Sequence, residues 1–358
     1  MENGMSGKEW WRPEIFTRRR GALQIRSQAI TATRTFFAER DFIEVETPCL
    51  QVSPGMEPHL KAFSTAFVDP YGEADQPLHL HTSPEFAMKK LLVAGVPRLY
   101  QMARVFRNSE RSPTHHPEFT MLEWYRAGAS LADLMTDTED LVRACARRVG
   151  APLLRRGETE CDPFQPWRRL SVPEAFRDYA GIDLLATAPD PIRPDTALLA
   201  AEAGRIGISV STSDRWDDIF FKIMLDRIEP HLGYGVPVIL HSYPVSMAAL
   251  SRPSPADPRL AERFEVYGCG VELANAFGEL TDPVEQRKRF EADMALKYTL
   301  YGERYPVDED FLAALDYGMP DSAGIALGFD RLVMLLAGVQ TIDEVLWAPV
   351  TTGPRYDR

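Results

Sequence analysis

The sequence predicts an α+β fold in which helices flank antiparallel strands. Two stretches, 97–126 and 263–280, alternate in character on both sides of a turn, which is typical of a β-hairpin. Two others, 15–40 and 283–301, have the amphipathic spacing of helices. Strands joined by a short turn pair antiparallel, so both hairpins favour an antiparallel sheet.

The totals limit the class of protein. The 358 residues are 45% hydrophobic, enough for one large domain or two ordinary ones. No apolar run has the length of a membrane span, and the basic start is not followed by the apolar segment of a secretory signal. The net charge of −12 gives no overall attraction to nucleic acid, although a local basic face stays open.

The cysteines predict neither a metal site nor a disulfide framework. Cys49, Cys145, Cys161 and Cys269 lie far apart and form no CxxC pair. Free cysteines are the rule in a reducing compartment, so we expect a cytoplasmic protein.

The helix 15–40 leads directly into a strand. In DFIEVETPCL, Phe42, Ile43 and Val45 predict the strand, and Pro48 ends it or places it at a sheet edge. A helix that feeds an edge strand is ordinary architecture and equally fits the seam of a dimer.

The next helix begins after a strand at 79–82. Two histidines on that strand lack a third ligand, so we interpret them as structural. Ser83 is the expected N-cap, Pro84 the first helical residue, and Glu85 lies in the first turn, with Gly95 ending the helix. Glu85 fits dipole compensation and ligand binding equally well at this point.

The hairpin 97–126 carries too many polar groups on one face for a simple core role. In its second strand, Phe119, Met121, Glu123 and Tyr125 share that face. A half-exposed hairpin is the plainer interpretation. A carboxylate between Met121 and Tyr125 argues against it, because a partly apolar pocket needs a cation to balance the charge.

Residues 130–230 have mostly helical patterns, with proline-rich joints at 151–168 and 187–194 and no internal repeat. We interpret this region as scaffold. Residues 236–240 then predict a short buried strand.

The second hairpin contains two glutamates. A turn at Gly268-Cys269 would place Glu265 directly opposite Glu272, with Cβ atoms roughly 5 Å apart. Like charges so placed are destabilising unless one is protonated or a cation lies between them. Two solvated glutamates at an edge are the alternative. We favour a divalent ion, and oxygen ligands suit Mg²⁺ that also holds phosphates.

The same strand continues with Asn275, Phe277 and Glu279 on one face. Strict alternation puts Glu272 on the opposite face. One common site therefore requires a bulge or a strong twist near Ala274.

Near the C-terminus, residues 324–328 predict a strand with small side chains at alternate positions, where a flat ligand can approach the backbone. Asp330 and Arg331 then open an apolar helix. Arginine is unfavourable for the dipole at a helix start, so Arg331 is expected to project towards an anion. Together with Arg107 it forms a pair that could hold a triphosphate.

These stretches together resemble the class II aminoacyl-tRNA synthetases, specifically the lysyl branch. FIEVETPCL resembles motif 1, FRNSERSPTHHPEFTMLEWY motif 2 and GIALGFDRL motif 3. TSPE, FEVYGCGVELANAFGEL and PEFTMLEWY are similar to the lysyl signature. The resemblance runs from Phe16 to Ala337. It implies a six- to seven-stranded antiparallel sheet flanked by helices, assembled as a homodimer through motif 1.

The resemblance also leads to expectations about domains. Lysyl-tRNA synthetases have an N-terminal anticodon-binding OB-fold of roughly 100 residues, whereas about 40 residues precede motif 1 here. We therefore expect an N-terminal extension at 1–14, one catalytic domain at 15–350, a tail at 351–358, and no anticodon recognition. A catalytic domain with lysyl motifs is similar to the elongation factor P–(R)-β-lysine ligases.

Two positions depart from the lysyl synthetase pattern. Motif 2 in that family has a glutamate near the adenine amino group, where this chain has Ser109 followed by Glu110. Motif 3 has a glycine where this chain has Ala326. The resemblance implies that this alanine narrows the pocket floor and favours a β-amino acid, by about 1–3 kcal/mol.

The resemblance implies ATP and Mg²⁺ as the nucleotide and metal. ATP would bend over the sheet with adenine between Phe119 and Arg331, while Arg107 holds the α-phosphate and acts with Arg331 in catalysis. Glu265 and Glu272 would hold Mg²⁺. The full set of implied ATP-binding residues is Arg107, Asn108, Ser109, Glu110, His116, Phe119, Glu272, Leu273, Gly328 and Arg331.

The resemblance further implies lysine or (R)-β-lysine as substrate. Glu123, Glu279 and Tyr125 would receive the side-chain ammonium, and Glu85 the other amino group. The remaining implied substrate-binding residues are Ser83, Pro84, Asn275, Phe277 and Ala326.

The implied reaction has two steps. The substrate carboxylate attacks the α-phosphorus to give an adenylate and pyrophosphate, by positioning and charge stabilisation without a general base. A lysine of elongation factor P then attacks the adenylate. The alternatives are a truncated enzyme that charges tRNA or a tRNA-like RNA, and a catalytically silent binding paralogue. A catalytically silent paralogue need not keep groups for phosphate and metal, and this chain retains Arg107, Arg331, Glu265 and Glu272.

Overall fold

The computed structural model describes residues 9–72 and 75–351. Most of the expected N-terminal extension and nearly all of the expected tail lie outside these residues. Every helix within the described part is too short or too polar to cross a bilayer.

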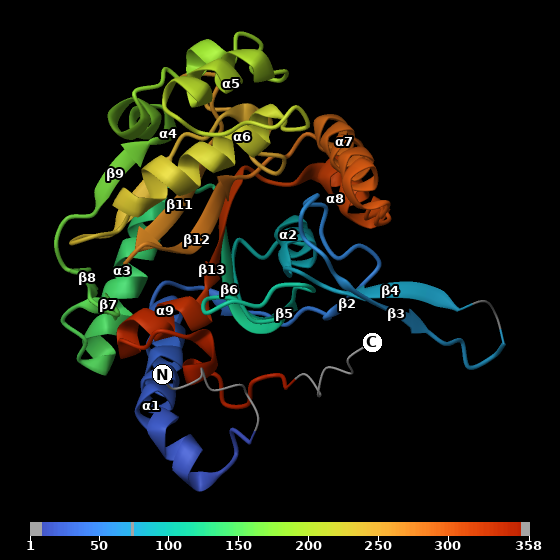
Figure 1. The fold of residues 1–358 in the computed structure, drawn as a ribbon. Helices are drawn as coiled ribbons and strands as arrows, with labels where there is room; N and C mark the ends of the chain where they lie inside the picture. The colour runs from blue at the N-terminus through green and yellow to red at the C-terminus, as the bar shows by residue number, and fades with distance from the viewer. Residues whose placement is uncertain (1–8, 73–74, 352–358) are drawn as a thin grey trace, which may run out of the picture.

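The main sheet of the described residues has eight strands in the order β1-β5-β6-β13-β12-β11-β10-β9 (Figure 1). The six strands from β5 to β10 pair antiparallel, as expected, and the outermost β1 and β9 each add a parallel pairing. The strands are β1 (Ile43–Glu44), β5 (Arg98–Phe106), β6 (Glu118–Ala127), β9 (Arg168–Ser171), β10 (Val238–His241), β11 (Arg263–Gly268), β12 (Val271–Gly278) and β13 (Ser322–Gly328).

Two small sheets and nine α-helices complete the part of the chain that is described. One small sheet joins β2 (Leu50–Gln51), β4 (Gln76–Leu80) and β3 (Phe63–Phe67), and the other joins β7 (Leu154–Arg156) and β8 (Thr159–Cys161). The helices are α1 (Pro13–Ala38), α2 (Glu85–Val93), α3 (Leu131–Val149), α4 (Val172–Ala175), α5 (Thr196–Arg205), α6 (Trp216–Ile223), α7 (Pro283–Tyr301), α8 (Glu309–Gly318) and α9 (Phe329–Ala337).

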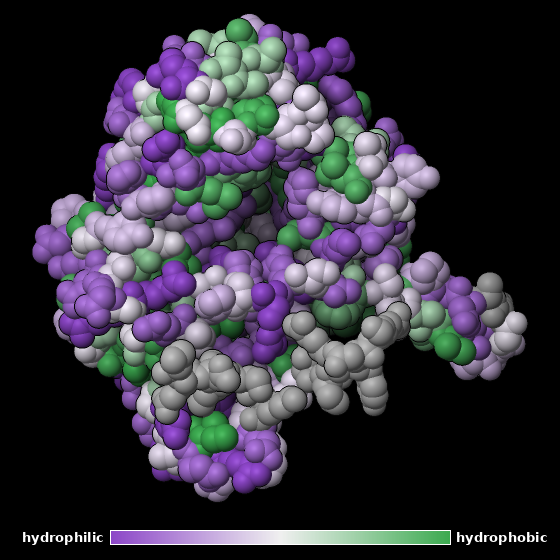
Figure 2. All heavy atoms as spheres, in the orientation of Figure 1, coloured by the Kyte–Doolittle hydropathy of each residue, from purple (hydrophilic) through white to green (hydrophobic). Residues whose placement is uncertain are grey.

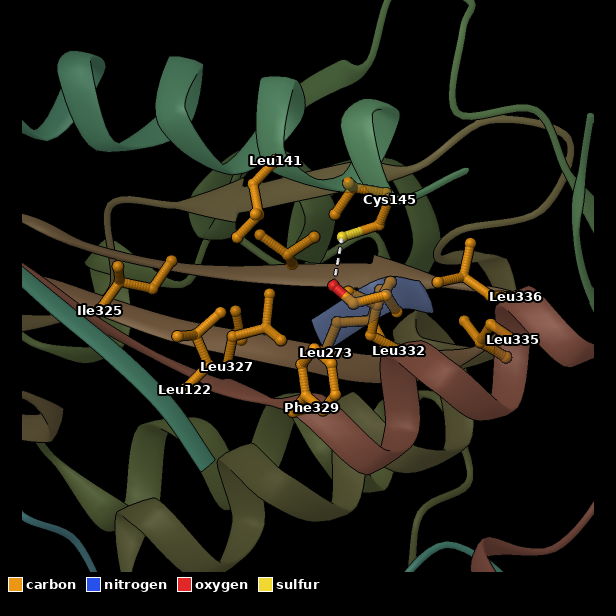
Figure 3. Close-up of a cluster of buried hydrophobic side chains, with 14 of the residues drawn as sticks. Leu122, Leu141, Cys145, Leu273, Ile325, Leu327, Phe329, Leu332, Leu335 and Leu336 are labelled. Atoms are coloured by element: carbon orange, nitrogen blue, oxygen red, sulfur yellow. Dashed lines mark hydrogen bonds between the residues drawn. The ribbon is translucent and has the colours of Figure 1, made fainter. Parts of the chain in front are cut away.

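Helices α1, α3 and α9 cover one face of the sheet. Figure 3 shows apolar side chains that fill this layer, among them Leu141 of α3, Leu332 of α9 and Leu327 of β13. At the end near β5, the Phe37 ring of α1 stacks on Tyr100 with centroids 4.3 Å apart. Because this face is closed by a continuous apolar core, the opposite face is the one left for a site.

The helical region 172–232 has its own apolar cluster next to β9 and β10 (Figure 1). On another side, α2, α7 and α8 pack together around Phe86, Phe290 and Phe311. The Phe86 and Phe311 rings stack at 4.7 Å. These two groups of helices flank the open face of the sheet.

The start of α2 differs by one residue from our prediction. The N-cap is Pro84, not Ser83, and Glu85 is the first helical residue. The Ser83 hydroxyl still accepts a hydrogen bond from the Glu85 backbone N–H at 3.1 Å. Ser83 is therefore left with a hydroxyl proton to donate elsewhere.

The predicted register of the second hairpin was wrong by one residue. The turn is Cys269-Gly270, both with positive φ, so Gly268 pairs with Val271. Gly233 approaches this hairpin so closely that a Cβ on it would lie 2.8 Å from the Gly268 Cα, so only glycine fits at position 233.

The predicted bulge in this hairpin is confirmed. The pairing shifts between Val266 and Tyr267, leaving Leu273 as the extra residue on β12. Glu265 therefore faces Asn275 rather than Glu272, which corrects the directly opposed pair of glutamates. The bulge puts Glu272 on the same face as Asn275, which strict alternation would have prevented.

Candidate active site

The open face of the sheet contains a cavity of about 280 Å³. Figure 2 shows this side of the molecule hollowed near its centre. Thirteen of the residues predicted for ATP or substrate binding line the cavity: Ser83, Glu85, Arg107, Glu110, His116, Phe119, Glu272, Leu273, Asn275, Phe277, Ala326, Gly328 and Arg331. The structure thus brings together segments separated by more than two hundred residues of sequence.

The remaining predicted residues do not line the cavity. Asn108 and Ser109 turn away in the loop after β5, and Pro84 lies at the start of α2. Glu123, Tyr125, Glu265 and Glu279 lie just outside the cavity, on strands β6 and β11 and directly after β12.

Arg107, which follows β5, is a cation with unused donor capacity. Its guanidinium lies over the Phe119 ring, 5.3 Å from the centroid. Its Nε is buried and has no hydrogen-bond partner in the described structure. A buried N–H of this kind is costly unless a ligand accepts from it, and an anion is the natural acceptor.

Arg331, at the start of α9, is held across the cavity from Arg107. It donates from Nη1 to the Glu272 carbonyl at 2.8 Å and from Nε to the Thr114 carbonyl at 3.2 Å. Its Nη2 lies 2.7 Å from Nε2 of His115. All three guanidinium nitrogens of Arg331 therefore have partners within the protein, and Arg331 and Phe119 line the same cavity.

The two neighbouring histidines have different surroundings. His116 was the predicted nucleotide contact, but its Nδ1 lies 2.5 Å from the Glu118 carbonyl and its Nε2 accepts from the Val350 N–H at 3.1 Å. His115, which sequence reasoning missed, instead faces Arg331. Burial and the Arg331 charge lower the pKa of His115.

The motif 2 departure has a structural counterpart. Ser109 has a φ of 65° and donates its backbone N–H to its neighbour Asn108 at 2.8 Å, which tightens the loop. Glu110 lies one residue later and lines the cavity. The chain therefore has a carboxylate in the cavity wall at position 110, one residue after the position that the family pattern gives it.

A buried ion pair beneath the cleft was also missed. Asp330 is 1% exposed, pairs with Arg26 of α1, and accepts the Thr120 backbone N–H at 2.7 Å. The same Arg26 donates to the Thr120 hydroxyl at 2.8 Å. The network ties α1, β6 and α9 together, which fixes Arg331 relative to the hairpin. An aspartate beside Arg331 was the only sequence signal.

The acidic pair Glu265 and Glu272 remains on one face despite the corrected register. Glu265 is held by Arg263 Nη2 at 2.6 Å and accepts from the hydroxyls of Tyr243 and Tyr267 at 2.6 and 2.8 Å. Although 43% of the Glu272 side chain is exposed, burial of the carboxyl and the Glu265 charge raise its pKa to about 7.

These two carboxylates fit Mg²⁺ only together with a ligand. The described residues contain no group of three or more metal-binding side chains. Mg²⁺ commonly takes one or two carboxylates and completes its shell with phosphate oxygens and water. The raised pKa of Glu272 shows that its ionised form is unfavourable here, and a bound cation would stabilise that form.

The acidic end of the cleft begins with Glu123, which is fully buried. One carboxylate oxygen accepts from the Ser83 hydroxyl at 2.6 Å and the other from the Tyr125 hydroxyl at 2.9 Å. Burial and the charge of Glu85 raise the pKa of Glu123 to about 8. This carboxyl is therefore ready to ionise when a cation enters.

Lys89, on α2, is the most important residue that sequence reasoning missed. It is 1% exposed and forms ion pairs with Glu85 and, at 2.5 Å, with Glu279. Burial opposes its charge, but both carboxylates hold the pKa of Lys89 above its usual range. Its position four residues after Glu85 on the expected helix was the available signal.

Glu279 is buried yet incompletely satisfied. Neither of its oxygens has a well-aligned hydrogen-bond donor, because Lys89 meets it as an ion pair without hydrogen-bond geometry. Burial raises its pKa to about 7, partly offset by Lys89. A further donor, such as a ligand ammonium, would complete its shell.

The floor between these groups is built from small residues. A Cβ on Gly324 would lie 2.2 Å from the Tyr125 ring and 2.4 Å from Glu279 Oε1. Ala326 pairs with Asn275 on one side and Glu123 on the other, and lines the cavity. Arginines at one end and carboxylates at the other suit a reaction between a nucleotide and a cationic acid.

Comparisons with known proteins agree with this geometry. The family described as tRNA synthetases class II (D, K and N) matches residues 16–352. The chain is 39% identical to an elongation factor P–(R)-β-lysine ligase of Proteus mirabilis, over 91% of this chain and 94% of that protein. For the ligase of the same name from Vibrio cholerae the identity and both shares are the same. A lysine–tRNA ligase of Dehalococcoides mccartyi is also 39% identical, over 90% of this chain and 63% of that protein.

Proposed function

Because the chain belongs to the class II tRNA synthetases (D, K and N), we propose that it activates (R)-β-lysine, or lysine, with ATP and transfers it to a lysine of elongation factor P. The chain is a synthetase-like ligase. Its match over nearly the whole length of the elongation factor P–(R)-β-lysine ligases supports this acceptor.

The observation that carries the proposal is the acidic end of the cleft. Glu85, Glu123 and Glu279 provide three carboxyl groups, and Lys89 supplies only one compensating charge. A diamino acid brings two ammonium groups, which would balance the other two carboxylates. An amino acid with a neutral side chain would leave one of them uncompensated.

In the activation step, the protein mainly positions and stabilises charge. Arg107 would hold the α-phosphate and Arg331 the opposite side of the nucleotide, with adenine against Phe119. Glu265 and Glu272 would hold Mg²⁺, which would offset phosphate charge. The substrate carboxylate attacks the α-phosphorus, and pyrophosphate leaves.

A second candidate is an enzyme that charges tRNA or a tRNA-like RNA. The 39% identity to a lysine–tRNA ligase favours it, because the activation step is common to both. The candidates differ only in the acceptor. Binding to tRNA would weaken steeply with salt, since phosphate contacts release counterions.

We also propose a homodimer formed through the expected motif 1, and a cytoplasmic location. The segment 43–52 supports the dimer because Ile43, Leu50 and Val52 are each about half exposed. Sedimentation of the wild type and of Ile43→Asp would test this. A monomeric wild type at micromolar concentration would contradict it.

The function is tested by the two half-reactions separately. ATP–pyrophosphate exchange should require a diamino acid, with (R)-β-lysine preferred over α-lysine. The mass of elongation factor P should then increase by one aminoacyl residue. Label on tRNA, with no increase in the mass of the factor, would overturn our first choice in favour of the second.

A further inference from the structure

A second cavity, of about 600 Å³, adjoins the first. The two share Glu57, Asn275 and Phe277 as lining residues. Its outer rim is open, because Ile192 and Phe221 are 55% and 45% exposed. We call the two adjoining cavities the passage: its outer end lies beside the helical region 172–232, and its inner end is the wall shared with the reaction cleft.

Glu57 lies at the junction of the two cavities. In the first cavity it lines the wall together with Arg107, expected at the α-phosphate, and Glu85, expected at an amino group. The acyl–phosphate bond of an adenylate must lie between those two groups. A Cβ on Gly55 would come within 3.0 Å of Glu57 Oε2, so the preceding glycine leaves room for this carboxylate.

Glu57 is also a carboxylate without a cation. No ion pair involves it within residues 9–72 and 75–351, and the same holds for Asp293 of α7 in the second cavity. The arginines of that cavity are already engaged: Arg215 pairs with aspartates, and Arg263 with Glu265. The passage therefore presents two carboxyl groups without an ion pair among the described residues, beside an apolar wall that includes Trp216.

We propose that this passage admits the acceptor lysine side chain, and that Glu57 receives its ammonium and accepts its proton before attack. The inference rests on the proposed function and deepens its second step. A lysine arm is aliphatic along its length and cationic at its tip, which matches apolar walls that lead to a carboxylate.

The transfer step balances as follows. The ammonium loses a proton to the Glu57 carboxylate, which becomes a carboxylic acid. The neutral amine attacks the carbonyl carbon of the mixed anhydride, forming the C–N bond. The acyl C–O bond breaks and AMP leaves with the electron pair, while the second amine proton passes to solvent.

The surroundings of Glu57 suit this role. Burial and the charge of Glu85 raise the pKa of its carboxyl, whereas Arg107 and Lys89 partly offset this, and Asp293 faces it from α7. A free lysine has a pKa near 10.4, so only about one amine in a thousand is neutral at pH 7.4. A nearby base raises the fraction of neutral amine at the site, because it accepts the ammonium proton there.

The test separates the two half-reactions in Glu57→Gln. Transfer to elongation factor P should fall by about 100-fold or more, and the residual rate should rise about tenfold per pH unit. Lysine-dependent ATP–pyrophosphate exchange should change less than about twofold. Release of the aminoacyl group to hydroxylamine, which is neutral near pH 7, should also persist.

Two further variants sharpen the test. Asp293→Asn should raise the KM for elongation factor P while kcat stays close to wild type. Glu291→Gln, an exposed carboxylate on the same helix, is the matched control and should leave both half-reactions unchanged.

Parallel losses of exchange and transfer in Glu57→Gln would overturn the inference, because Glu57 would then serve activation. Unchanged transfer would also overturn it. If wild type modifies tRNA but not elongation factor P, the proposed function fails along with the inference.

Discussion

The two ends of the cleft differ in the sign of their charge and in whether the protein itself supplies a counterion. At the nucleotide end, Arg107 lies over an aromatic ring with an unused buried N–H. At the amino-acid end, Lys89 pairs with both Glu85 and Glu279 and balances one of their two charges. Arg107 therefore has no counterion within the described protein, whereas the carboxylates at the other end have Lys89 as a permanent one.

The difference follows from solvent access. The Glu272 side chain at the nucleotide end is 43% exposed, although burial of its carboxyl raises its pKa to about 7, whereas the Glu279 side chain is fully buried. Two neighbouring buried carboxylates are costly to ionise without a cation, because desolvation costs several kcal/mol per ion. An internal lysine lets the acidic end fold before the substrate arrives.

Lys89→Met gives the largest expected effect, because it removes the internal cation. Two buried carboxylates would lose their partner, which should lower the free energy of unfolding by about 3–5 kcal/mol. Urea denaturation measures this. Lys90→Met is the matched control, since Lys90 is partly exposed and pairs with Asp308 and Asp310. If both variants lose equal stability, Lys89 has no special role.

Arg107→Ala tests the other end. Removal of a preorganised charge at the reacting phosphate should lower the rate of ATP–pyrophosphate exchange by about 10²–10³-fold. Stability should change little, because Arg107 makes no ion pair among the described residues. A loss of stability as large as that of Lys89→Met would remove the contrast between the ends.

Glu279→Gln should separate amino-acid binding from ATP binding. The substrate ammonium would lose a charged partner, so the KM for lysine should rise by about 30–100-fold, equivalent to about 2–3 kcal/mol. ATP affinity, measured calorimetrically without amino acid, should stay near wild type. Equal loss of both would place Glu279 with the nucleotide.

The two ends should also differ in pH dependence. Burial raises the pKa of Glu279 to about 7 and that of Glu123 to about 8 in the ligand-free protein. Both carboxyls must ionise to receive ammonium groups, so the KM for lysine should fall by more than about a hundredfold between pH 6 and pH 8.

Stability of the ligand-free protein should show the opposite trend. A carboxyl with a raised pKa binds more protons when folded than when unfolded, so stability falls as the pH rises from about 4.5 to about 8. Urea denaturation across this range, with and without lysine, measures both trends. A KM that is constant from pH 6 to pH 8 would contradict this interpretation.

Ala326→Gly gives the smallest expected effect. Removal of one methyl group from the floor should shift the preference from (R)-β-lysine towards α-lysine by about tenfold, within the 1–3 kcal/mol of such contacts. The ratio of kcat/KM for the two substrates in exchange measures it. An unchanged ratio would show that the floor does not discriminate between them.

The sequence by itself determined the elements and the residue types of the cleft. Alternation identified β5 and β6 with Glu123 inside, and the need for a bulge near Ala274 followed from residue parity alone. These results depend on local periodicity, which a chain carries without reference to distant segments.

Only the tertiary structure decided which groups neutralise one another. Gly268 lies against Gly233, which approaches from another part of the chain. Lys89 meets Glu279 across 190 residues, and Asp330 meets Arg26 across 304. Charge balance in a buried site depends on distance in space, and sequence spacing fixes that distance only within a single element.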